Sequence, residues 1–363
     1  MTLLYSEVEE ELRASVRGLL ADRCPHSAVL GRVESEPYDL GLWKTLAGEI
    51  GVAGLLVPEE LGGAGASARE AAVVLEELGR AVAPVPFLTS AVLATRALLP
   101  TRDALLAELA EGRTTAALAV SFAASPYRPD RGSSVSVDGD GRLSGTVTGV
   151  AGADVADVLL VPVDGDLYAA EGSSVAAGPS LDLTRPVATV TFDRAEARRV
   201  GTCDLAAVLR FGAGLLASEQ LGVAEWCLET TLAYVKERHQ FARPVGSFQA
   251  IKHRLADLWL DVVRARAAAR AAAGDAAGDA AGNAAGAADA ALPVSAAVAQ
   301  AWNAVVAVHA AEEALQLHGG IGMTWEHPVH LYLKRAKATE IALGTPGDHR
   351  AALASLVGVP GPE

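Results

Sequence analysis

The middle of the chain constrains the fold most, because its hydrophobic pattern differs from the pattern on either side. Residues 114–200 contain short runs rich in Val and Thr, separated by Gly and Asp-Gly turns, as in SVSVDGDGRLSGTVTGV and PVATVTFDRAEARRV. Such runs are typical of β-strands joined by tight turns. We therefore expect an all-β unit here, either a small barrel or a sandwich.

The segments on either side have helical periodicity. Apolar residues recur at spacings of three and four from about residue 5 to 99 and again from about 204 to 356, which is typical of amphipathic helices. The order helices, strands, helices predicts a mainly α fold with a central β domain. We place an N-terminal helical domain at 1–112, the β domain at 113–202 and a C-terminal helical bundle at 203–363.

Charge and cysteine content exclude several classes of function. Acidic residues outnumber basic ones by 44 to 30, and a surface of this sign repels polyanions, so nucleic acid is not an expected partner. Cys24, Cys203 and Cys227 are too widely spaced for a disulfide framework or a metal-ligand set. We expect a cytoplasmic protein.

Neither a secretion signal nor a membrane span is expected. The chain turns acidic close to its start, whereas a signal peptide begins basic and continues apolar. The longest apolar stretch, residues 295–315, contains Gln300, Asn303, His309 and Glu312, which a bilayer would disfavour. This stretch is therefore predicted to be a buried helix.

Residues 270–292 form a low-complexity stretch in which Gly recurs every fourth residue among Ala, Asp and Asn. Each glycine costs a helix about 1 kcal/mol relative to alanine. We expect a frayed connection between two long helices. A helix whose glycine stripe allows close packing is the alternative.

The segment RHQFARPVGSFQAIKHRLAD (238–257) combines a helix end, a Pro-Gly turn and a new helix. Ser247, with Gln249 in the first turn, is the predicted N-cap of that helix. Arg238, Arg243 and the exposed N–H groups of the turn would suit a pyrophosphate. Two helices joined by a turn with solvated arginines are the alternative.

The second informative segment, QLHGGIGMTWEH, lies nearer the C-terminus. Gln316 and His318 lead into Gly319-Gly320-Ile321-Gly322, where a backbone without Cβ atoms can approach a ligand closely. On its own such a run more often just ends a helix.

Together these runs resemble the acyl-CoA dehydrogenase family of flavoproteins. The likeness extends to LWKTLAGEIGVAGLLVPEELGGAGAS and VVLEELGRAVAPVPFLTSAVLA nearer the N-terminus, so it covers nearly the whole chain in order. The resemblance implies an N-terminal helical domain, a middle β-barrel and a C-terminal four-helix bundle. It also implies FAD bound between the subunits of a dimer or a dimer of dimers.

The reaction implied by the resemblance is α,β-desaturation of an acyl-CoA thioester. A carboxylate removes the α-proton, and the β-hydrogen leaves as hydride to the flavin, whose chemistry is the cofactor's own. The protein supplies the base and the hydrogen bonds that polarise the thioester. An electron-transfer flavoprotein is one candidate electron acceptor.

The resemblance also assigns cofactor contacts by position. Seven residues would touch the pyrophosphate and adenine side of FAD across a subunit boundary, whereas Thr345 would belong to the flavin site of its own chain. The seven are Arg238, Gln240, Phe241, Gln249, Gln316, Gly319 and Gly320.

The chain departs from the family at the catalytic base. In IALGTPG, Leu343 stands where the family's Y-E-G-T run has its glutamate. Some members carry the base on the first helix of the C-terminal bundle, and that position aligns near Gly212. Neither residue can accept a proton, so the sequence assigns no catalytic residue to this chain.

Glu340 and Glu219 are the nearest carboxylates to these positions. Glu340 lies about one helical turn before Leu343, so we expect it to be solvated or paired with Lys337. Glu219 has leucines around it in the sequence and is expected to be a buried carboxylate of the bundle. A base role is the alternative for each.

The middle domain departs as well. SFAASPYRPDRGSS (121–134) replaces the usual first FAD loop, a T-E-P-G-A-G-S-D type run, and TVTGVAGAD (146–154) replaces the usual W-I-T/S run. The groups that hold the isoalloxazine ring are therefore expected to be largely missing.

His318, His327 and His330 could suggest a metal site. They lie in the family run, however, with no Cys or Asp at ligand spacing. We expect them to have structural or cofactor-proximal roles and predict no metal.

Three functions follow as hypotheses. In the first, the chain pairs with a paralogous chain that holds the base and most FAD contacts, as in heteromeric family members that often act on bulky CoA thioesters such as those of steroid side chains. In the second, it is a homomeric flavoenzyme with an unusual base or a different reaction. In the third, it is a non-catalytic binding or scaffold protein without a cofactor.

Overall fold

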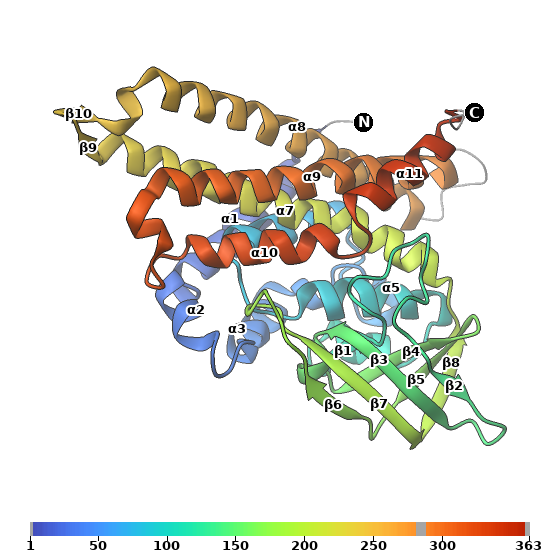
Figure 1. Cartoon of the computed structure of the whole chain (residues 1–363). Helices are drawn as coiled ribbons and strands as arrows, with labels where there is room; N and C mark the ends of the chain where they lie inside the picture. Colours follow the sequence, from blue (N-terminus) through green and yellow to red (C-terminus); the bar gives the residue numbers. More distant parts are fainter. Residues whose placement is uncertain (1–2, 281–287, 360–363) are drawn as a thin grey trace.

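The computed structural model describes residues 3–280 and 288–359 and shows helices, then strands, then helices (Figure 1). This confirms the predicted fold class. The N-terminal part consists of six α-helices and five short π- or 3₁₀-helices. They are α1 (Glu7–Arg23), α2 (His26–Arg32), α3 (Leu40–Thr45), η1 (Leu46–Ile50), η2 (Val52–Gly54), η3 (Glu59–Leu61), α4 (Ala68–Arg80), η4 (Phe87–Ala94), α5 (Thr95–Leu98), η5 (Leu99–Thr101) and α6 (Leu105–Ala110).

The middle part contains two four-stranded sheets, ordered β1-β4-β5-β8 and β2-β3-β7-β6. Strand β1 runs parallel to β4, and the other pairs in these sheets are antiparallel. Residues of both sheets share one apolar core, so the all-β unit takes a two-sheet form. The elements are β1 (Ala116–Leu118), β2 (Ser136–Val137), β3 (Leu143–Ala151), η6 (Ala153–Val155), β4 (Val158–Val163), β5 (Asp166–Ala170), β6 (Ser174–Ala177), β7 (Val187–Ala195) and β8 (Ala197–Thr202).

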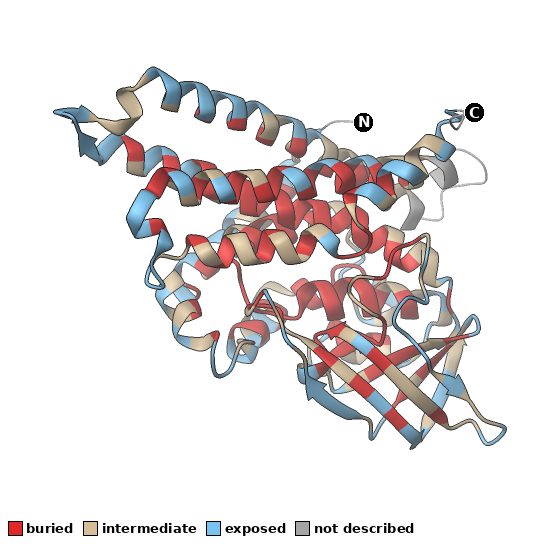
Figure 2. Ribbon diagram, viewed as in Figure 1, coloured by how far each residue is buried: buried red, intermediate tan, exposed pale blue. Residues whose placement is uncertain are grey.

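The C-terminal part is a bundle of four helices, α7 to α10, to which α11 is added. Its residues are buried mainly along α7 and α9 (Figure 2). The elements are α7 (Leu205–Glu237), β9 (His239–Gln240), β10 (Arg243–Pro244), η7 (Val245–Ser247), α8 (Gln249–Ala280), α9 (Ala288–His318), η8 (Gly319–Met323), α10 (Val329–Ile341) and α11 (Pro346–Leu356).

The changes in secondary structure fall close to the predicted domain limits. The last helix before the strands ends at Ala110, and β8 ends at Thr202. The division into 1–112, 113–202 and 203–363 stays a prediction.

Helix α9 contains the apolar stretch 295–315 and is long and apolar enough to span a membrane by length and composition. In this chain it packs against α7, α8 and α10, as predicted for a buried helix. Its polar residues crosslink the bundle. Gln300 Nε2 donates to the carbonyl of Ala342 at 3.1 Å, and Asn303 Nδ2 donates to the carbonyls of Ala217 and Ala265 at 2.9 and 3.0 Å.

The low-complexity stretch differs from our expectation. Helix α8 continues to Ala280 and α9 begins at Ala288, so the predicted frayed connection is wrong for residues 270–280 and 288–292, where the alternative, a helix, is found; residues 281–287 lie outside the described part. The reason is tertiary packing, because Ala272 and Ala276 are fully buried. Burial of such a helical face can outweigh the weak helix propensity of glycine.

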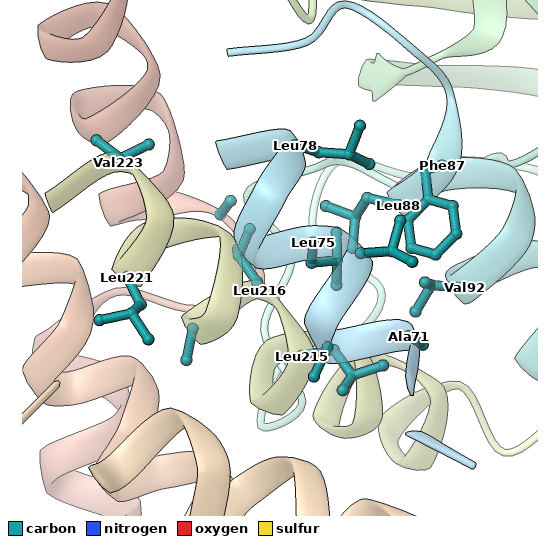
Figure 3. Packing of buried hydrophobic residues seen from close by; sticks show 14 of the residues in the cluster. Ala71, Leu75, Leu78, Phe87, Leu88, Val92, Leu215, Leu216, Leu221 and Val223 are labelled. Carbon is teal, nitrogen blue, oxygen red and sulfur yellow. The ribbon is translucent and has the colours of Figure 1, made fainter. Parts of the chain in front are cut away.

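Helix α4 packs on α7 through glycines. Figure 3 shows the apolar core at this contact, where leucines of α4 face leucines of α7. A Cβ atom built on Gly79 would lie 2.1 Å from the carbonyl oxygen of Glu219, and one on Gly222 would lie 1.9 Å from the carbonyl oxygen of Glu76. The two backbones therefore approach so closely that neither position accepts a side chain.

We expect Gly222→Ala to destabilise the chain by about 1–3 kcal/mol, because the new methyl group must push the α4 backbone away. Denaturant unfolding monitored by circular dichroism measures this. Gly18→Ala is the matched control. Gly18 is also helical but has open space around its Cβ position, so alanine should be neutral or stabilise by up to about 1 kcal/mol. Equal stability of the Gly222→Ala variant and the wild type would contradict the close contact.

Candidate functional site

Most of the predicted cofactor residues lie at one end of the bundle, which we call the hairpin end. It consists of the C-terminal end of α7, the β9–β10 hairpin, the start of α8, and the C-terminal end of α9 with η8 (Figure 1). The ends of α7 and α9 meet there, since the rings of Tyr234 and His318 stack at 4.5 Å. Arg254 of α8 forms an ion pair with Glu313 of α9 at 2.6 Å. Segments far apart in sequence are thus held together.

The hairpin has a strained, exposed tip. Phe241 and Ala242 have φ angles of 52° and 61°, the left-handed conformation that a two-residue hairpin turn requires and that non-glycine residues rarely adopt. The Phe241 ring is 88% exposed. The guanidinium of Arg243 lies 3.8 Å from the centre of the Phe248 ring behind it. An exposed aromatic side chain on a fixed turn is suited to contact a group outside this chain.

The seven predicted FAD contacts, Arg238, Gln240, Phe241, Gln249, Gln316, Gly319 and Gly320, are all exposed, and all lie at this end. Arg238 forms no ion pair with any residue that the structure describes. Added Cβ atoms at Gly319 and Gly320 would meet no atom within 4 Å, so both backbones are open to a ligand. Thr345 lies apart from the seven, at the start of α11.

The predicted N-cap of α8 is wrong. The helix begins at Gln249, and the carbonyl of Phe248 accepts hydrogen bonds from Ile251 and Lys252 at 3.1 Å each, so Phe248 holds the N-cap position. The Oγ atom of Ser247 is buried without a hydrogen-bond partner among the described residues. Ser247 is the last residue of the short helix η7 and lies one residue before the N-cap position, so its hydroxyl does not cap α8.

The two positions at which family members carry the base meet in space. Leu343 is 1% exposed, and its Cδ1 atom lies 3.1 Å from where a Cβ of Gly212 would be; Cδ2 of Leu93 lies 2.4 Å from the same point. The place expected for a base is therefore filled by two leucine side chains. No proton acceptor reaches it from either candidate position.

The segment around Leu343 is held by loop 121–134. The Leu343 N–H donates to the Phe122 carbonyl at 2.9 Å, and the Leu343 carbonyl lies 3.0 Å from Nε2 of His349. Nδ1 of the same imidazole is 3.1 Å from the Tyr127 hydroxyl. Burial lowers the pKa of His349, so it is neutral at pH 7. The loop that replaces the FAD loop thus binds to the chain itself.

Other groups of this region are also engaged within the chain. Thr345 Oγ1 accepts from the Asp348 N–H at 3.1 Å and donates to its carboxylate at 2.8 Å, which forms the capping box of α11. The Phe122 N–H donates to the Gly149 carbonyl at 2.8 Å. These hydrogen bonds leave the hydroxyl of Thr345 and the backbone of Phe122 unavailable to a flavin ring. A flavin role for Thr345 stays a prediction.

Glu219 is a buried bundle carboxylate, as its apolar neighbours predicted. Both of its oxygens accept from Arg185, at 2.9 and 2.5 Å, and Oε1 also accepts from Arg335 at 3.1 Å. Burial alone would raise the pKa of Glu219, but the two guanidinium groups outweigh this and hold the pKa below its ordinary value. A carboxylate so paired is a poor general base.

Glu340 is paired as predicted. Its carboxylate lies 3.7 Å from the Lys337 ammonium group, one turn earlier on α10. Lys337 also pairs with Glu312 at 3.3 Å. The contacts of Glu340 thus support a surface role.

The ionic cluster that surrounds Glu219 could not be predicted from the sequence runs described above. Asp182 and Arg335 form a second ion pair there, and Nη2 of Arg335 donates to Thr184 Oγ1 at 2.6 Å. We call Asp182, Arg185, Glu219 and Arg335 the Arg335 network. It joins the β6–β7 loop to α7 and α10. Only a charged pattern such as Asp-x-Thr-Arg in a strand connection could have drawn attention to it.

The histidines near the hairpin end do not form a metal site. No group of three or more His, Cys, Asp or Glu residues that could hold a metal ion occurs among the described residues. The rings of His318 and His327 lie 4.6 Å apart, and burial lowers the pKa of each. His330 stacks on Trp325 at 4.4 Å. Their contacts are those of packing residues.

Comparisons with known proteins identify the family. Residues 6–100 match the model described as "Acyl-CoA dehydrogenase, N-terminal domain", and residues 202–357 match "Acyl-CoA dehydrogenase, C-terminal domain". Acyl-CoA dehydrogenase IpdE2 of Mycobacterium tuberculosis is 37% identical over 345 residues, which cover 94% of each protein. The chain belongs to the acyl-CoA dehydrogenase family.

Solved structures of this family have the same fold. The ChsE4-ChsE5 complex from Mycobacterium tuberculosis is 30% identical with a TM-score of 0.85 and covers 100% of both chains. A variant of the Tcur3481-Tcur3483 steroid ACAD is 32% identical with a TM-score of 0.84 and covers 98% of this chain and 99% of that chain.

The acyl-CoA dehydrogenase family consists of oxidoreductases that act on CH–CH bonds with FAD as cofactor, which confirms the expected enzyme class and cofactor. The described residues fit FAD unequally. The hairpin end offers an unpaired guanidinium, amides and two open glycine backbones, which suit a dinucleotide. In the region around Leu343, the polar groups form hydrogen bonds with other groups of the same chain and are not available to FAD.

Proposed function

We propose that this chain is the second, non-catalytic subunit of a heteromeric acyl-CoA dehydrogenase. In the assembled enzyme, its hairpin end contacts the pyrophosphate and adenine of FAD bound to a paralogous chain. The paralogue supplies the base and the contacts to the flavin ring, and the pair desaturates an acyl-CoA thioester.

One observation carries this proposal, namely the contrast between the two ends of the expected cofactor path. The hairpin end is exposed, and the Arg238 guanidinium and the Gly319 and Gly320 backbones are available there, whereas the position of the base is occupied by Leu343 and Leu93. A chain that catalyses the reaction on its own flavin would need both the hairpin end and a base. A chain that only completes the FAD site of a neighbouring subunit needs the hairpin end alone.

The relatives support the proposal in two respects. One solved relative is a complex of two components, ChsE4 and ChsE5, and another is a variant of a steroid ACAD. For this chain we therefore propose a paralogous partner and a bulky acyl-CoA substrate. The acyl group of a polycyclic compound would match that class.

The visible absorption spectrum tests the proposal. The chain should carry no stoichiometric flavin when expressed alone and should contribute to a flavin-containing complex when expressed with its paralogue. Stoichiometric flavin on the chain alone would instead support a homomeric flavoenzyme. A lack of flavin in both preparations would support a non-catalytic scaffold.

We expect Arg238→Ala to weaken FAD retention in the assembled enzyme about tenfold to a hundredfold. A charge-assisted hydrogen bond to a phosphate contributes about 1.5–3 kcal/mol, and this guanidinium has no other ionic partner among the described residues. Flavin content after extensive dialysis measures the effect. Arg264→Ala is the control, because Arg264 is exposed on α8 and its one ionic partner among the described residues is Asp261 at 3.5 Å. Unchanged flavin occupancy in the Arg238 variant would count decisively against the assignment.

A further inference from the structure

A pocket of about 270 Å³ lies where the β domain meets α10. It is lined by residues 121–123, Gly149, residues 179–182, Arg185, Val187 and the C-terminal end of α10. Both segments that depart from the family's FAD loops, 121–134 and 146–154, therefore contribute to its wall. What these replacement segments bind is not explained by the proposed function.

The wall of this pocket is mainly apolar, although Asp182, Arg185 and Lys337 also contribute to it. Phe122, Val187 and Ala342 line the inside. Two large aliphatic side chains that line the pocket project into solvent: Leu181 of the β6–β7 loop is 57% exposed and Ile341 of α10 is 52% exposed. Exposed aliphatic residues on both sides of a concave surface are typical of ligand-binding grooves.

Every charged side chain in the wall is paired with another residue of the chain. Asp182 pairs with Arg335, and Arg185 forms a bidentate pair with Glu219 at 2.5 and 2.9 Å. Lys337 lies 3.3 Å from Glu312 and 3.7 Å from Glu340. The pocket therefore offers no uncompensated charge to a ligand.

Several of its hydrogen-bonding groups are engaged within the chain as well. Both backbone groups of Phe122 are bonded, the N–H to Gly149 and the carbonyl to Leu343. Ser180 Oγ donates to the Gly178 carbonyl at 3.1 Å and accepts from the Val187 N–H at 2.9 Å. A ligand with a polar edge, such as an isoalloxazine ring, would leave that edge unpaired against this wall.

We propose that this pocket binds an uncharged, mainly apolar small molecule compact enough for a cavity of about 270 Å³. The paired charges exclude an ionic ligand, and the bonded polar groups favour a ligand that needs few hydrogen bonds. The apolar wall and the Leu181 and Ile341 rim supply the binding surface. This site belongs to the chain itself and does not depend on the hairpin end or on a partner.

Competition with Nile red, a neutral fluorescent dye, tests the proposal on the full-length chain. Progesterone, a neutral ring compound, should displace the dye. Cholate, which is anionic, and lumiflavin, which has a polar ring edge, should displace it at least tenfold less effectively. If lumiflavin competes as well as progesterone, or if cholate competes better, the proposed chemistry is wrong.

Two variants locate the binding. Ala338→Phe should fill the pocket from α10 and weaken progesterone binding at least tenfold, and Leu181→Ser should weaken it severalfold by removing one side of the rim. Leu181 itself is 57% exposed, so this variant is testable even if Ala338→Phe does not fold. Ala271→Phe, at a shallow hollow between α8 and α9, is the matched control and should bind as the wild type does. Progesterone binding unchanged by Leu181→Ser, and by Ala338→Phe where that variant folds, would overturn the proposal.

Discussion

When acyl-CoA thioesters are added to the isolated chain under anaerobic conditions, any FAD supplied in excess should stay oxidised. The position of the base holds Leu343, which is 1% exposed and packed near Gly212 and Leu93. General base catalysis contributes about 10²–10⁴ in rate, so its loss alone makes reduction at least that much slower. Bleaching of the flavin absorbance, followed in a stopped-flow instrument, is the measurement.

The complex with the paralogous chain is the positive control and should bleach rapidly. Glu340→Gln in this chain should leave that rate unchanged, because Glu340 is paired with Lys337 rather than placed beside Leu343. Rapid bleaching by the isolated wild-type chain would contradict the prediction that this chain lacks a base. If Glu340→Gln then abolished that bleaching, Glu340 would be the base.

Arg335→Met should lower the free energy of unfolding by about 3–5 kcal/mol, the usual cost of removing one partner from a buried ion pair. Arg335 is fully buried, and its three guanidinium nitrogens donate to Asp182, Glu219 and Thr184. Methionine fills much of the volume but removes the ion pair of Asp182 and leaves Glu219 with Arg185 as its one ionic partner among the described residues. Denaturant unfolding of the purified chain provides the measurement.

Lys334→Met is the matched control for Arg335→Met. Lys334 precedes Arg335 on α10, but its ammonium group lies over the Trp325 ring at 4.2 Å instead of in the network, so its loss should cost no more than about 1 kcal/mol. The effect of Arg335→Met should also depend on pH. The pKa of Glu219 is lowered on folding. The stability that the ionised Glu219 carboxylate gives the folded chain is therefore fully present above its ordinary pKa of about 4.3, and it is lost as the pH falls through the lowered pKa of the folded state. A difference between the two variants of less than about 1 kcal/mol at pH 7 would show that the network adds little stability.

Local patterns in the sequence predicted the elements, and through them the fold. The alternation of β3 and β7 and the apolar spacing of α4 and α7 depend on neighbours in the chain, so their types could be inferred. The N-cap at Ser247 failed because η7 intervenes before α8. The helix over residues 270–280 was only the alternative prediction, because the packing that stabilises it comes from other helices.

The candidate site was predictable where a run of sequence carries it and not where distant residues assemble it. The hairpin end comes from two contiguous runs, so its seven residues could be named. In the Arg335 network, Arg335 bonds to residues far away along the chain. Asp182 lies 153 residues before it and Glu219 lies 116 residues before it. No local pattern encodes such pairings. The meeting of Leu343, Gly212 and Leu93 is likewise a property of the folded chain.

The glycine contact between α4 and α7 also limits how related subunits can exchange parts. The helix backbones approach so closely that there is no room for a Cβ atom on Gly79 or Gly222. The surface of each helix therefore has to fit the surface of the other. A chimera that takes its N-terminal helices from one paralogue and its bundle from another would cut across this contact. Helices α4 and α7 therefore have to be exchanged together, and the β6–β7 loop, whose Arg185 pairs with Glu219 of α7, has to match α7 as well.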